Sequence, residues 1–381
     1  MLHPMRTKNF VLFLICIVIC SVFLCLFGNQ RPSIQTIVTE THKQLNNLKN
    51  FKENLKDAEE KRLIADEKYL MLLGFTETPR LYPEGVLKNT TLPHIVTHVS
   101  EDQEKHGIGF ARNVQHFLPN HSISIYNLGL GQYELEKLVK HCNSSRCSVI
   151  NFDYSQFPSH VEDDRLQAYR PLLIQDALNR AGSVLFLDVS HRLFPGSYRA
   201  LSAMVNKLTG KGSEKGPGIL AHATRHPVSS LTHPKMFGYF HTEPAAYYFL
   251  PMIESSPLLL LNTHRVHSEL MLPWVQCALT RDCLGPLGAQ SAGCRFDKKP
   301  QYRYSGCHHY DGSALNVALG LMFQFEERRY VFLENDEPIV RKLTEDEIAA
   351  EAALLEEEEE GRGGPDDNAT VSTPSVRHIS P

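Results

Sequence analysis

The sequence lacks the loops that bind nucleotide phosphates in two large classes of α/β enzyme. It contains neither a G-x-x-x-x-G-K-[ST] loop nor a G-x-G-x-x-G turn after its first expected strand. The stretch "LGLGQYELEKL" has only Gly129 and Gly131, which suit a tight turn. These absences disfavour P-loop chemistry and Rossmann-type cofactor binding.

Other catalytic signatures are also missing. The chain has no C-x-x-C pair, which disfavours a zinc knuckle. The stretch "HSELMLPW" contains H-x-E, but it has no P-C-x-x-C partner, so a zinc deaminase is disfavoured as well. No G-x-S-x-G elbow is present, and this weakens the case for a hydrolase.

Clustered positive charge is absent too. The 381 residues carry a formal net charge of -4, and residues 341–381 alone hold 11 acidic against 4 basic side chains. Nothing resembles the basic face of a nucleic-acid-binding protein, so nucleic acid is excluded as a partner. The acidic, low-complexity segment 341–381 is predicted to be a disordered tail whose plain role is solubility.

The amino-terminal region contains the longest uncharged run of the chain. Phe10–Gly28 has no charged residue and is long enough to cross a bilayer as a helix. A cleaved signal peptide is the rival reading, but its apolar part is usually only about 7–15 residues and ends in a small-residue cleavage pattern. Arg6 and Lys8 precede the run and only Arg31 follows closely, which favours a cytosolic stub at 1–9. We therefore expect a single-pass type II anchor at 10–28 in the Golgi or ER membrane, with a lumenal head.

Cysteines and glycosylation sequons agree with a lumenal location. Three of the nine cysteines lie in the apolar run, which leaves an even six, and six can close three bridges in an oxidising lumen. Close spacing favours Cys142 with Cys147 and, less strongly, Cys277 with Cys283, although zinc binding by the same six remains an alternative. N-x-[ST] sequons, typical of glycoproteins, begin at Asn89, Asn120, Asn143 and Asn368.

Residues 29–75 are predicted to form a helical stem. Between Ile34 and Leu73 the sequence is rich in Lys, Glu and Leu and nearly free of Gly and Pro. Its apolar residues form a broken stripe at helical spacing, which suits a stalk, a weak coiled coil that pairs two copies as a homodimer, or a simple solvated helix. A folded head at 76–340 then lies between the stem and the tail.

Within the head, strand-like and helix-like patterns alternate. Strands are expected at 94–100, 122–130, 147–154, 183–189, 218–224 and 258–264, and helices at 104–118, 132–142, 165–182, 198–210 and 267–279. This order predicts an α/β fold with a mainly parallel sheet that is covered by helices on both faces. Ligands of such sheets bind beyond the carboxyl ends of the strands.

The stretch "SVLFLDVSHRLF" (183–194) places a carboxylate at one of these ends. Four apolar residues lead into Asp188, and Ser190, His191 and Arg192 follow. Asp188 could simply cap the next segment. A carboxylate at the ligand-binding edge could instead hold a divalent cation, which would neutralise a diphosphate.

The surrounding sequence is similar to a known class of enzyme. "YRPLLIQDALNRAGSVLFLDVSHRL" (169–193) resembles the core of GT-A, nucleotide-diphospho-sugar transferase-like glycosyltransferases of the secretory pathway, and is closest to an uncharacterised, nematode-expanded animal group. "HHYDGSALNVAL" (308–319) resembles a "DQ-ALN" segment of several such families. The resemblance implies a GT-A-like fold and a hexosyltransferase-type activity that uses a nucleotide-sugar donor and a glycan, protein or lipid acceptor.

The resemblance also implies roles for individual residues. Arg170 would contact the donor phosphate, Asp188 would bind a cation or the nucleotide-sugar and take part in catalysis, and Asp311 would face the acceptor or donor sugar as a catalytic base. The second acid of a D-x-D motif is replaced by Ser190. Coordination of Mn²⁺ or another divalent cation would then need His191, His308 or His309, or a water held by Ser190; alternatively, basic side chains stabilise the leaving diphosphate without metal.

Each of these residues also has a structural explanation. Arg170 could pair with an acid on its own helix, and Asp311 could be the cap of the following helix. The acidic cluster Glu162–Asp164 is most simply first-turn charge of a helix. The serine at position 190 further favours an alternative function, a catalytically inactive glycosyltransferase-like lumenal protein that binds a glycan or chaperones a partner.

Overall fold

The computed structural model describes residues 11, 14–23, 62–76, 81, 92–210, 216–297, 299–332, 338–362 and 377–378. The chain divides into two compact units, Met1–Lys61 and Arg62–Pro381.

In the first unit, residue 11 and residues 14–23 are helical, and their side chains are exposed. Among the described residues, no helix is both long enough and apolar enough to cross a membrane. The remaining residues of the expected anchor at 10–28, and residues 29–61 of the expected stem at 29–75, lie outside the described residues.

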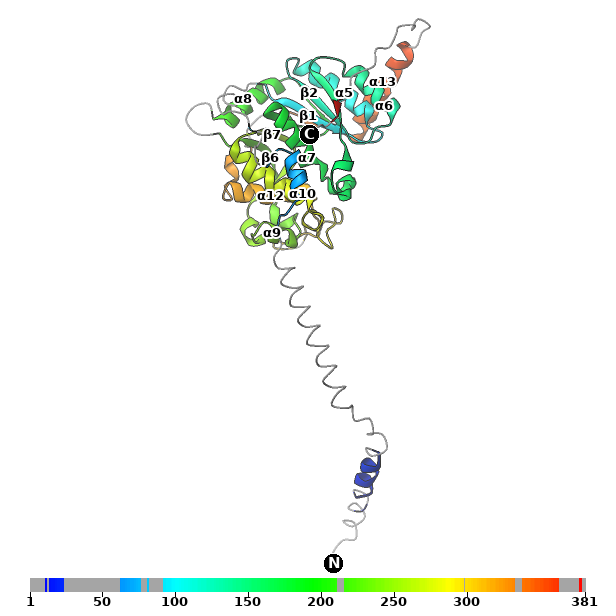
Figure 1. The fold of residues 1–381 in the computed structure, drawn as a ribbon, viewed down its shortest axis with the longest axis vertical. Coiled ribbons are helices and arrows are strands. Elements are labelled where there is room, and N and C mark those ends of the chain that lie inside the picture. The colour runs from blue at the N-terminus through cyan, green and yellow to red at the C-terminus, as the bar shows by residue number, and fades with distance from the viewer. Residues whose placement is uncertain are drawn as a thin grey trace, which may run out of the picture. The chain divides into compact units, whose positions relative to one another are not determined.

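The second unit is built on one mixed sheet, of which β1, β2, β6 and β7 are labelled in Figure 1. In the described residues the strand order is β6-β7-β4-β1-β2-β3-β9. Its parallel part consists of β1 (His94–Val99), β2 (Ile123–Asn127), β3 (Cys147–Asn151), β4 (Ser183–Phe186) and the short β9 (Arg377–His378). The strands β6 (Ile219–Pro227) and β7 (Pro251–Leu261) are antiparallel to their neighbours. The predicted α/β class with a mainly parallel sheet is confirmed.

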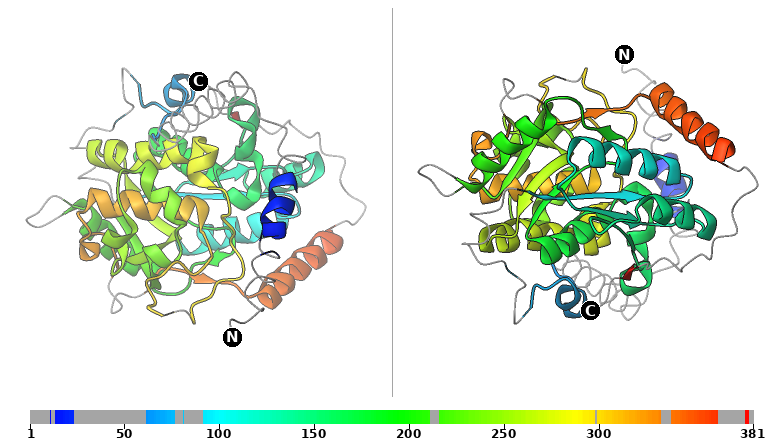
Figure 2. Two further views of the ribbon diagram at one scale, coloured as in Figure 1. Left: turned by 90° about the horizontal axis from the view of Figure 1, so that it is seen from below. Right: turned by 90° about the horizontal axis from the view of Figure 1, so that it is seen from above.

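Helices cover both faces of the sheet (Figure 2). One face packs against α7 (Tyr169–Ala181), α10 (Leu272–Leu279) and α12 (Tyr310–Met322). The other face packs against α5 (Glu104–Phe117), α6 (Gln132–His141) and α8 (Ser197–Thr209). Alternate residues of one strand serve the two faces, since Val184 and Phe186 join the first core and Leu185 and Leu187 the second. Short helices complete the unit: α3 (Glu67–Leu72), α9 (Pro234–Tyr239), α11 (Arg281–Leu284), a π-helix at Val266–Met271, and 3-10 turns at Tyr154–Gln156, Ser159–Glu162, Asp164–Leu166, Val228–Ser230, Pro244–Tyr247 and Glu327–Arg329.

The strand order reverses between β1 and β4. From β1 the chain moves outward through β2 and β3, and β4 then returns to the opposite side of β1. At such a switch point of an open α/β sheet, ligands bind in the crevice at the carboxyl ends of the two adjacent strands. His98, near the end of β1, and Asp188, just after β4, lie at this point.

Two expectations about the sheet need correction. Strand β7 runs antiparallel to both of its neighbours, β4 and β6, so β6 points the same way as β4, and β7 begins at Pro251 rather than at residue 258. The first half of β7 reads "PMIESSP", which lacks the continuous apolar run of a buried strand because Glu254 is exposed there. The pairing of β7 with β6 is also interrupted by register shifts at Ala223. Side chains therefore do not alternate regularly between the two faces there, and the sequence shows only a weak strand pattern.

The acidic segment is not wholly disordered as expected. Arg341–Lys342 (β8) pairs with His191–Arg192 (β5), and α13 spans Glu345–Arg362. Leu355 of α13 is buried in the second core, and Glu358 pairs with Arg112 of α5 at 2.9 Å. The folded unit therefore continues beyond residue 340, because an acidic helix finds both an apolar contact and basic partners.

The folded unit also begins earlier than the predicted boundary at residue 76. The helix α3 starts at Glu67, and Leu73 is buried in the first core. The carbonyl of Leu73 accepts hydrogen bonds from the side-chain amides of Gln175, at 3.3 Å, and Asn179, at 2.9 Å, both on α7. Residues 62–76 thus belong to the head and not to the stem.

Three disulfides staple the unit. Cys142–Cys147 and Cys277–Cys283 are the two pairs that close spacing favours, and both are confirmed. The third joins Cys294 to Cys307 and closes a loop between α11 and α12. With all six thiols in bridges, the zinc alternative is overturned for these cysteines.

Candidate functional site

An open cleft of ≈ 440 Å³ lies where the start of α7, the middle of β7 and the start of α12 meet. We call it the central cleft. Its lining is mostly polar and consists of Asp164, Arg165, Gln167, Arg170, Ser255, Ser291, His308, His309, Tyr310 and Asp311. Two of the three residues with predicted catalytic or donor-binding roles, Arg170 and Asp311, therefore face one space.

Arg170 and Asp311 form a buried ion pair at this cleft. Nη1 of Arg170 donates to Oδ2 of Asp311 at 2.5 Å, and the two side chains are 9% and 3% exposed. The sequence suggested a partner for Arg170 on its own helix, but the partner comes from α12, 141 residues along the chain. Removal of either member would leave a buried charge, which costs about 3–5 kcal/mol in proteins.

The pair retains capacity to bind an anion. Nε of Arg170 is buried and has no hydrogen-bond partner among the described residues. Burial alone would lower the pKa of Arg170, but the charges of Asp311 and Asp188 outweigh burial and raise that pKa. A permanently charged, planar guanidinium with an unused donor is suited to phosphate oxygens.

Burial has the opposite effect on the carboxyl of Asp311. It raises the pKa of Asp311 to about 6, although the charge of Arg170 and its hydrogen bond act to lower it. A carboxylate with a pKa near the working pH can accept a proton in a reaction and release it afterwards.

Asp188 lies beside the central cleft and not among its lining residues. It follows β4 on the same face of the sheet as Val184 and Phe186, the face that α7 covers, and it is half-buried. Its backbone N–H donates to Oγ of Ser256 on β7 at 2.8 Å. Its charge acts on Arg170, Asp311 and His98, so it belongs to the same electrostatic cluster.

His98 is a member of this cluster that the sequence patterns did not single out. Val96 of β1 pairs with Phe186 of β4, which places His98 level with Asp188 across the crevice. The ring of His98 stacks on Phe186 with centroids 6.0 Å apart, and Nδ1 is buried without a partner in the described structure. Burial lowers the pKa of His98 to about 4, so the ring is neutral at pH 7. The available signal in the sequence was its position near the carboxyl end of an expected strand, two residues after the apolar Val96.

A short hydrogen-bonded chain connects His98 to the rim of the central cleft. The hydroxyl of Tyr169 lies 3.4 Å from Nε2 of His98 and donates to Oδ1 of Asp164 at 2.9 Å. Asp164 belongs to the acidic cluster that the sequence explains as first-turn charge, and it begins a 3-10 turn. Asp164 thus lines the cleft as well as supplying the charge of this first turn.

Packing of α12 against β7 sets the position of Asp311. The amide of Asn316 accepts from the N–H of Ile253 at 2.7 Å and donates to its carbonyl at 3.1 Å, where β7 is irregularly paired. A Cβ on Gly312 would lie 2.7 Å from Oγ of Ser255, so a larger residue here would require that hydroxyl to move. The "DGSALN" stretch therefore aligns Asp311 by joining its helix to the strand, and Trp274 fixes the Asp311 carbonyl at 2.9 Å.

Ser190 and His191 do not reach the central cleft. The carbonyl of Ser190 accepts from the N–H of Leu343 at 2.9 Å, and His191 is buried in β5 beside β8. Nδ1 of His191 lies 3.3 Å from Oγ of Ser256, the group that also accepts from Asp188. Through these contacts, Ser190 and His191 shape the turn after Asp188. In this structure they do not make the predicted contact with a cofactor in the central cleft.

The predicted metal role of His308 is wrong for this conformation. Its ring is buried, Nδ1 accepts from the backbone N–H of His233 at 3.1 Å, and Nε2 donates to the carbonyl of Leu284 at 2.9 Å. Both nitrogen atoms are therefore committed to the backbone. Burial lowers the pKa of His308 to about 3, which fits a ring that stays neutral as a structural link.

The side chains near Asp188 do not form a ready cage for a divalent cation. A protein-held cation of this kind needs several oxygen or nitrogen ligands. Among the described residues, no group of three or more His, Cys, Asp or Glu side chains could hold a metal ion. Position 190 offers a serine in place of a second carboxylate. Arg170, whose charge interacts with that of Asp188, supplies positive charge at this place.

Comparison with known proteins found no matching family model and no matching curated protein. Among solved structures, the chain is similar to the galactosyltransferase LgtC in complex with donor and acceptor sugar analogues, with 12% identity, 72% of this chain and 98% of that chain covered, and a TM-score of 0.35. It is similar to the bifunctional glycosyltransferase WbbM, with 13% identity, coverage of 64% and 39%, and a TM-score of 0.36. It is also similar to mouse xyloside xylosyltransferase 1, with 11% identity, coverage of 63% and 84%, and a TM-score of 0.32. All three are glycosyltransferases.

Proposed function

We propose that the chain is a glycosyltransferase that moves a sugar from a nucleotide-diphospho-sugar donor to a hydroxyl of a glycan, protein or lipid. The observation that carries the proposal is the buried guanidinium of Arg170, which faces an open polar cleft with one donor unused and has Asp311 and Asp188 beside it. The cleft adjoins the crevice at the carboxyl ends of β1 and β4, where α/β sheets bind ligands.

Each side chain has a defined task in this reaction. Arg170 binds the diphosphate and stabilises the negative charge that develops when the bond from the sugar carbon to the phosphate oxygen breaks. The acceptor oxygen forms the new bond to that carbon, and its proton passes to Asp311 if the acceptor attacks directly. Asp188 orients the donor sugar through its hydroxyl groups. The nucleoside diphosphate leaves with the electron pair of the broken bond.

A divalent cation such as Mn²⁺ remains a proposal of the sequence resemblance. Asp188 is the single carboxylate that the turn offers for it, so the cation would depend mainly on the donor diphosphate and water for its ligands. When bound, it would supply further neutralisation of the diphosphate. No step above depends on it.

Nucleotide binding is the first test. Thermal unfolding of the purified full chain in detergent is followed with a panel of nucleoside diphosphates, with and without Mn²⁺. Ligand at 100 times its dissociation constant stabilises the folded state by about 2.7 kcal/mol. We expect at least one nucleotide to raise the unfolding temperature, and Arg170→Lys to reduce the shift because the planar fork is lost.

Transfer itself is tested with Asp188→Asn. The side chain is half-buried, so the variant is expected to fold and to be secreted normally, while sugar transfer from the donor identified by nucleotide binding falls by at least ~100-fold. Transfer is measured as release of the nucleoside diphosphate in the presence of acceptor. Unchanged turnover in Asp188→Asn would remove this residue from the mechanism.

A second candidate is a catalytically inactive, glycosyltransferase-like protein that binds a glycan or assists a partner in the lumen. The observation that favours it is the serine at position 190, where a D-x-D motif has its second acid. Absence of a thermal shift with every nucleotide, in a sample that still binds a glycan, would support this candidate over the enzyme.

We also propose that the chain is a single-pass type II protein of the Golgi or ER membrane with its head in the lumen. The uncharged run 10–28, the three disulfides and the exposed sequon asparagines Asn120 and Asn143 support this orientation. Protease added to sealed microsomes should spare the head, and glycosidase treatment should increase its gel mobility. Pairing of two copies through the stem at 29–75 is tested by chemical cross-linking of the same membranes.

A further inference from the structure

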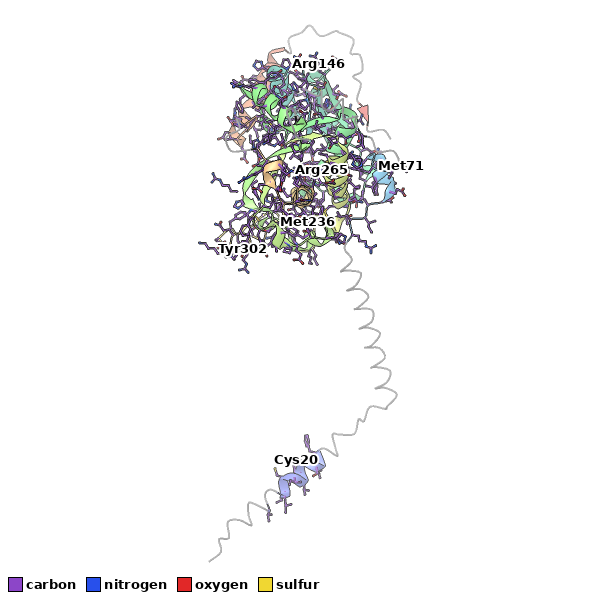
Figure 3. The ribbon with its side chains drawn as sticks, turned by 90° about the vertical axis from the view of Figure 1, so that its left-hand side faces the viewer. Cys20, Met71, Arg146, Met236, Arg265 and Tyr302 are labelled. Atoms are coloured by element: carbon purple, nitrogen blue, oxygen red, sulfur yellow. A yellow bond between two sulfur atoms is a disulfide. The ribbon has the colours of Figure 1, made fainter. Side chains whose placement is uncertain are left out.

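A second cleft, of ≈ 400 Å³, opens at the beginning of β7. We call it the aromatic cleft and define it by its lining residues Arg225, Pro227, Tyr248, Phe249, Pro251, Gln301 and Tyr302. Figure 3 labels Tyr302 at the margin of the folded unit. The proposed transfer reaction does not use this cleft.

Three aromatic rings dominate the aromatic cleft. Tyr248 and Tyr302 stack with centroids 4.2 Å apart, and Phe249 lies edge-on to Tyr302 at 6.1 Å. Phe249 is 87% exposed. Burial of such a side chain is worth about 1.5–3 kcal/mol, so its exposure forgoes a stabilising contact. A large exposed ring beside two stacked rings is typical of a surface that receives a ligand.

The backbone around the rings is held in place before any ligand arrives. Oγ of Ser229 donates to the carbonyl of Tyr302 at 2.9 Å, and the N–H of Val228 donates to the carbonyl of Leu250 at 2.9 Å. The Cys294–Cys307 disulfide closes the loop that carries Gln301 and Tyr302. A preformed arrangement loses little conformational entropy when it binds.

Two routes connect the aromatic cleft with the central cleft. Along β7, Pro251 lines the first and Ser255 the second, and four residues of strand span at most about 13 Å. Across the surface, His226 stacks on the partly exposed Phe296 with centroids 3.9 Å apart, and its charge acts on His309 at the central cleft. Aromatic side chains therefore continue from one cleft towards the other.

We propose that the aromatic cleft binds the body of an oligosaccharide acceptor whose terminal sugar lies in the central cleft. One face of a pyranose ring presents several C–H bonds, which pack against the electron-rich face of an aromatic ring. Arg225 and Gln301 supply donors for hydroxyl or carboxylate oxygens at the rim. The inference rests on the proposed function and narrows the acceptor to an extended glycan.

The chemistry of the lining separates a glycan from other occupants. An acyl chain requires a deep, mainly aliphatic pocket, whereas this cleft is open and combines rings and prolines with a guanidinium and an amide. Arg225 makes no ion pair within the described residues, so its charge is available to a ligand. A protein partner or a second copy of the chain remains an outcome of the test.

The test measures glycan binding to the full chain in detergent micelles by titration calorimetry, without nucleotide. The probes are the neutral chitotetraose and an acidic chondroitin tetrasaccharide. The variants are Phe249→Ala and Tyr302→Ala, with Tyr133→Ala as the matched control. Tyr133 is a 71% exposed ring on α6, which lines neither cleft. Because Phe249 is so exposed, its removal should leave the unfolding temperature unchanged.

We expect at least one probe to bind, and Phe249→Ala to weaken it roughly three- to tenfold, the range expected for loss of one aromatic contact. Tyr133→Ala should bind as the native chain does. Absence of binding by both probes, equal binding by Phe249→Ala, or an equal loss in Tyr133→Ala would overturn the proposal. Concentration-dependent self-association that Phe249→Ala abolishes would also overturn it, in favour of a protein interface.

The same samples separate this proposal from the proposed transfer reaction. Nucleotide-dependent thermal shifts report on Arg170 and should be equal in native chain and Phe249→Ala. Glycan binding that depends on Phe249, with no response to any nucleotide, would leave the inference standing and remove the transferase. Nucleotide binding that depends on Arg170, with no glycan binding, would support the transferase and overturn the proposal for the aromatic cleft.

Discussion

Arg170 and Asp311 show how one contact can give two residues different tasks. The carboxylate fixes one edge of the guanidinium at 2.5 Å, and this leaves Nε for a ligand. The same burial that makes the pair rigid raises the pKa of Asp311 to about 6. A residue that positions the diphosphate-binding group is thus also able to exchange a proton near neutral pH.

The pH dependence of turnover tests this assignment. Asp311 accepts a proton only when it is ionised, so turnover of the native chain should rise with pH through about 6 and then level off. Asp311→Asn should lower turnover by ~100-fold or more and abolish this limb. The measurement is the rate of nucleoside diphosphate release between pH 4.5 and 8.

The control for this prediction is stability. Asp311→Asn also breaks the ion pair, so thermal unfolding of the variant must confirm that it is folded at the assay temperature. A folded variant that keeps the same limb would assign the titration to another group.

At the residue scale, the sequence identified the site only in part. Arg170, Asp188 and Asp311 were found because each lies in a recognisable stretch. The pairing of Arg170 with Asp311 could not be found, since 141 residues separate them and they meet only in the fold, where α10 packs against both α7 and α12. His98 is a single polar residue in a strand, and its importance depends on the neighbour that the sheet register gives it.

At the level of elements, α13 supports the turn that follows Asp188. Nη2 of Arg192 donates to Glu351 at 2.6 Å, and Nη1 donates to the carbonyls of Val189, at 2.7 Å, and His191, at 2.8 Å. The side chain of Arg192 is only 6% exposed. The guanidinium of Arg192 therefore joins α13 to the turn that follows Asp188.

Glu351→Ala tests this connection. The change leaves a nearly buried guanidinium without its carboxylate, so we expect a loss of about 1–3 kcal/mol in the free energy of unfolding and slower turnover. Denaturant unfolding and the transfer assay provide the two measurements. Glu357→Ala, on the exposed side of the same helix, is the control and should change neither. Equal effects of the two substitutions would argue against the role of Arg192.

The loop between α11 and α12 serves both clefts. It carries Ser291 of the central cleft and Gln301 and Tyr302 of the aromatic cleft. Replacement of Cys294 and Cys307 by Ser should lower the free energy of unfolding by about 3 kcal/mol, the value for a loop of similar length. Glycan binding should weaken as well. The Cys142/Cys147 double serine variant should lose stability but retain glycan binding in the folded fraction, and the opposite pattern would contradict this prediction.

The helix α13 was predictable in part. Thr344 and Glu347 form a capping box, in which the N–H of Thr344 donates to Glu347 at 2.9 Å and the N–H of Glu347 donates to Oγ1 of Thr344 at 3.3 Å. The following "IAAEAALL" consists mainly of strong helix formers. The acidic composition of the segment predicted disorder despite these helix signals. The sequence alone does not show that basic side chains of α5 lie opposite the helix.

At the scale of the whole molecule, buried histidines should make the fold sensitive to acid. Burial lowers the pKa of His94, His98 and His267 to about 4 and that of His308 to about 3. The folded state therefore binds these protons less tightly than the unfolded chain, and stability present above about 6.5 is lost as pH falls towards 4. The raised pKa values of Asp311 and Glu254 act in the opposite direction, but these two carboxyl groups are outnumbered by the histidines whose pKa burial lowers.

The unfolding temperature should accordingly fall by at least ~5 °C between pH 7 and pH 4.5. Differential scanning calorimetry across this range measures it. In His308→Gln, which keeps a donor and an acceptor but cannot ionise, the dependence on pH should be shallower. A native unfolding temperature that stays constant or rises on acidification would refute the expectation.

The seal that residues 62–76 form against α7 has a consequence for shedding. Leu73 and its carbonyl complete the first core from the amino-terminal side, and the compact unit that contains this core begins at Arg62. A protease that severs the chain upstream of this point would liberate an intact head with both clefts, whereas a cut just after Phe75 would strip away part of its core. Release of an intact head therefore depends on whether the chain is cut before Arg62 or after Phe75.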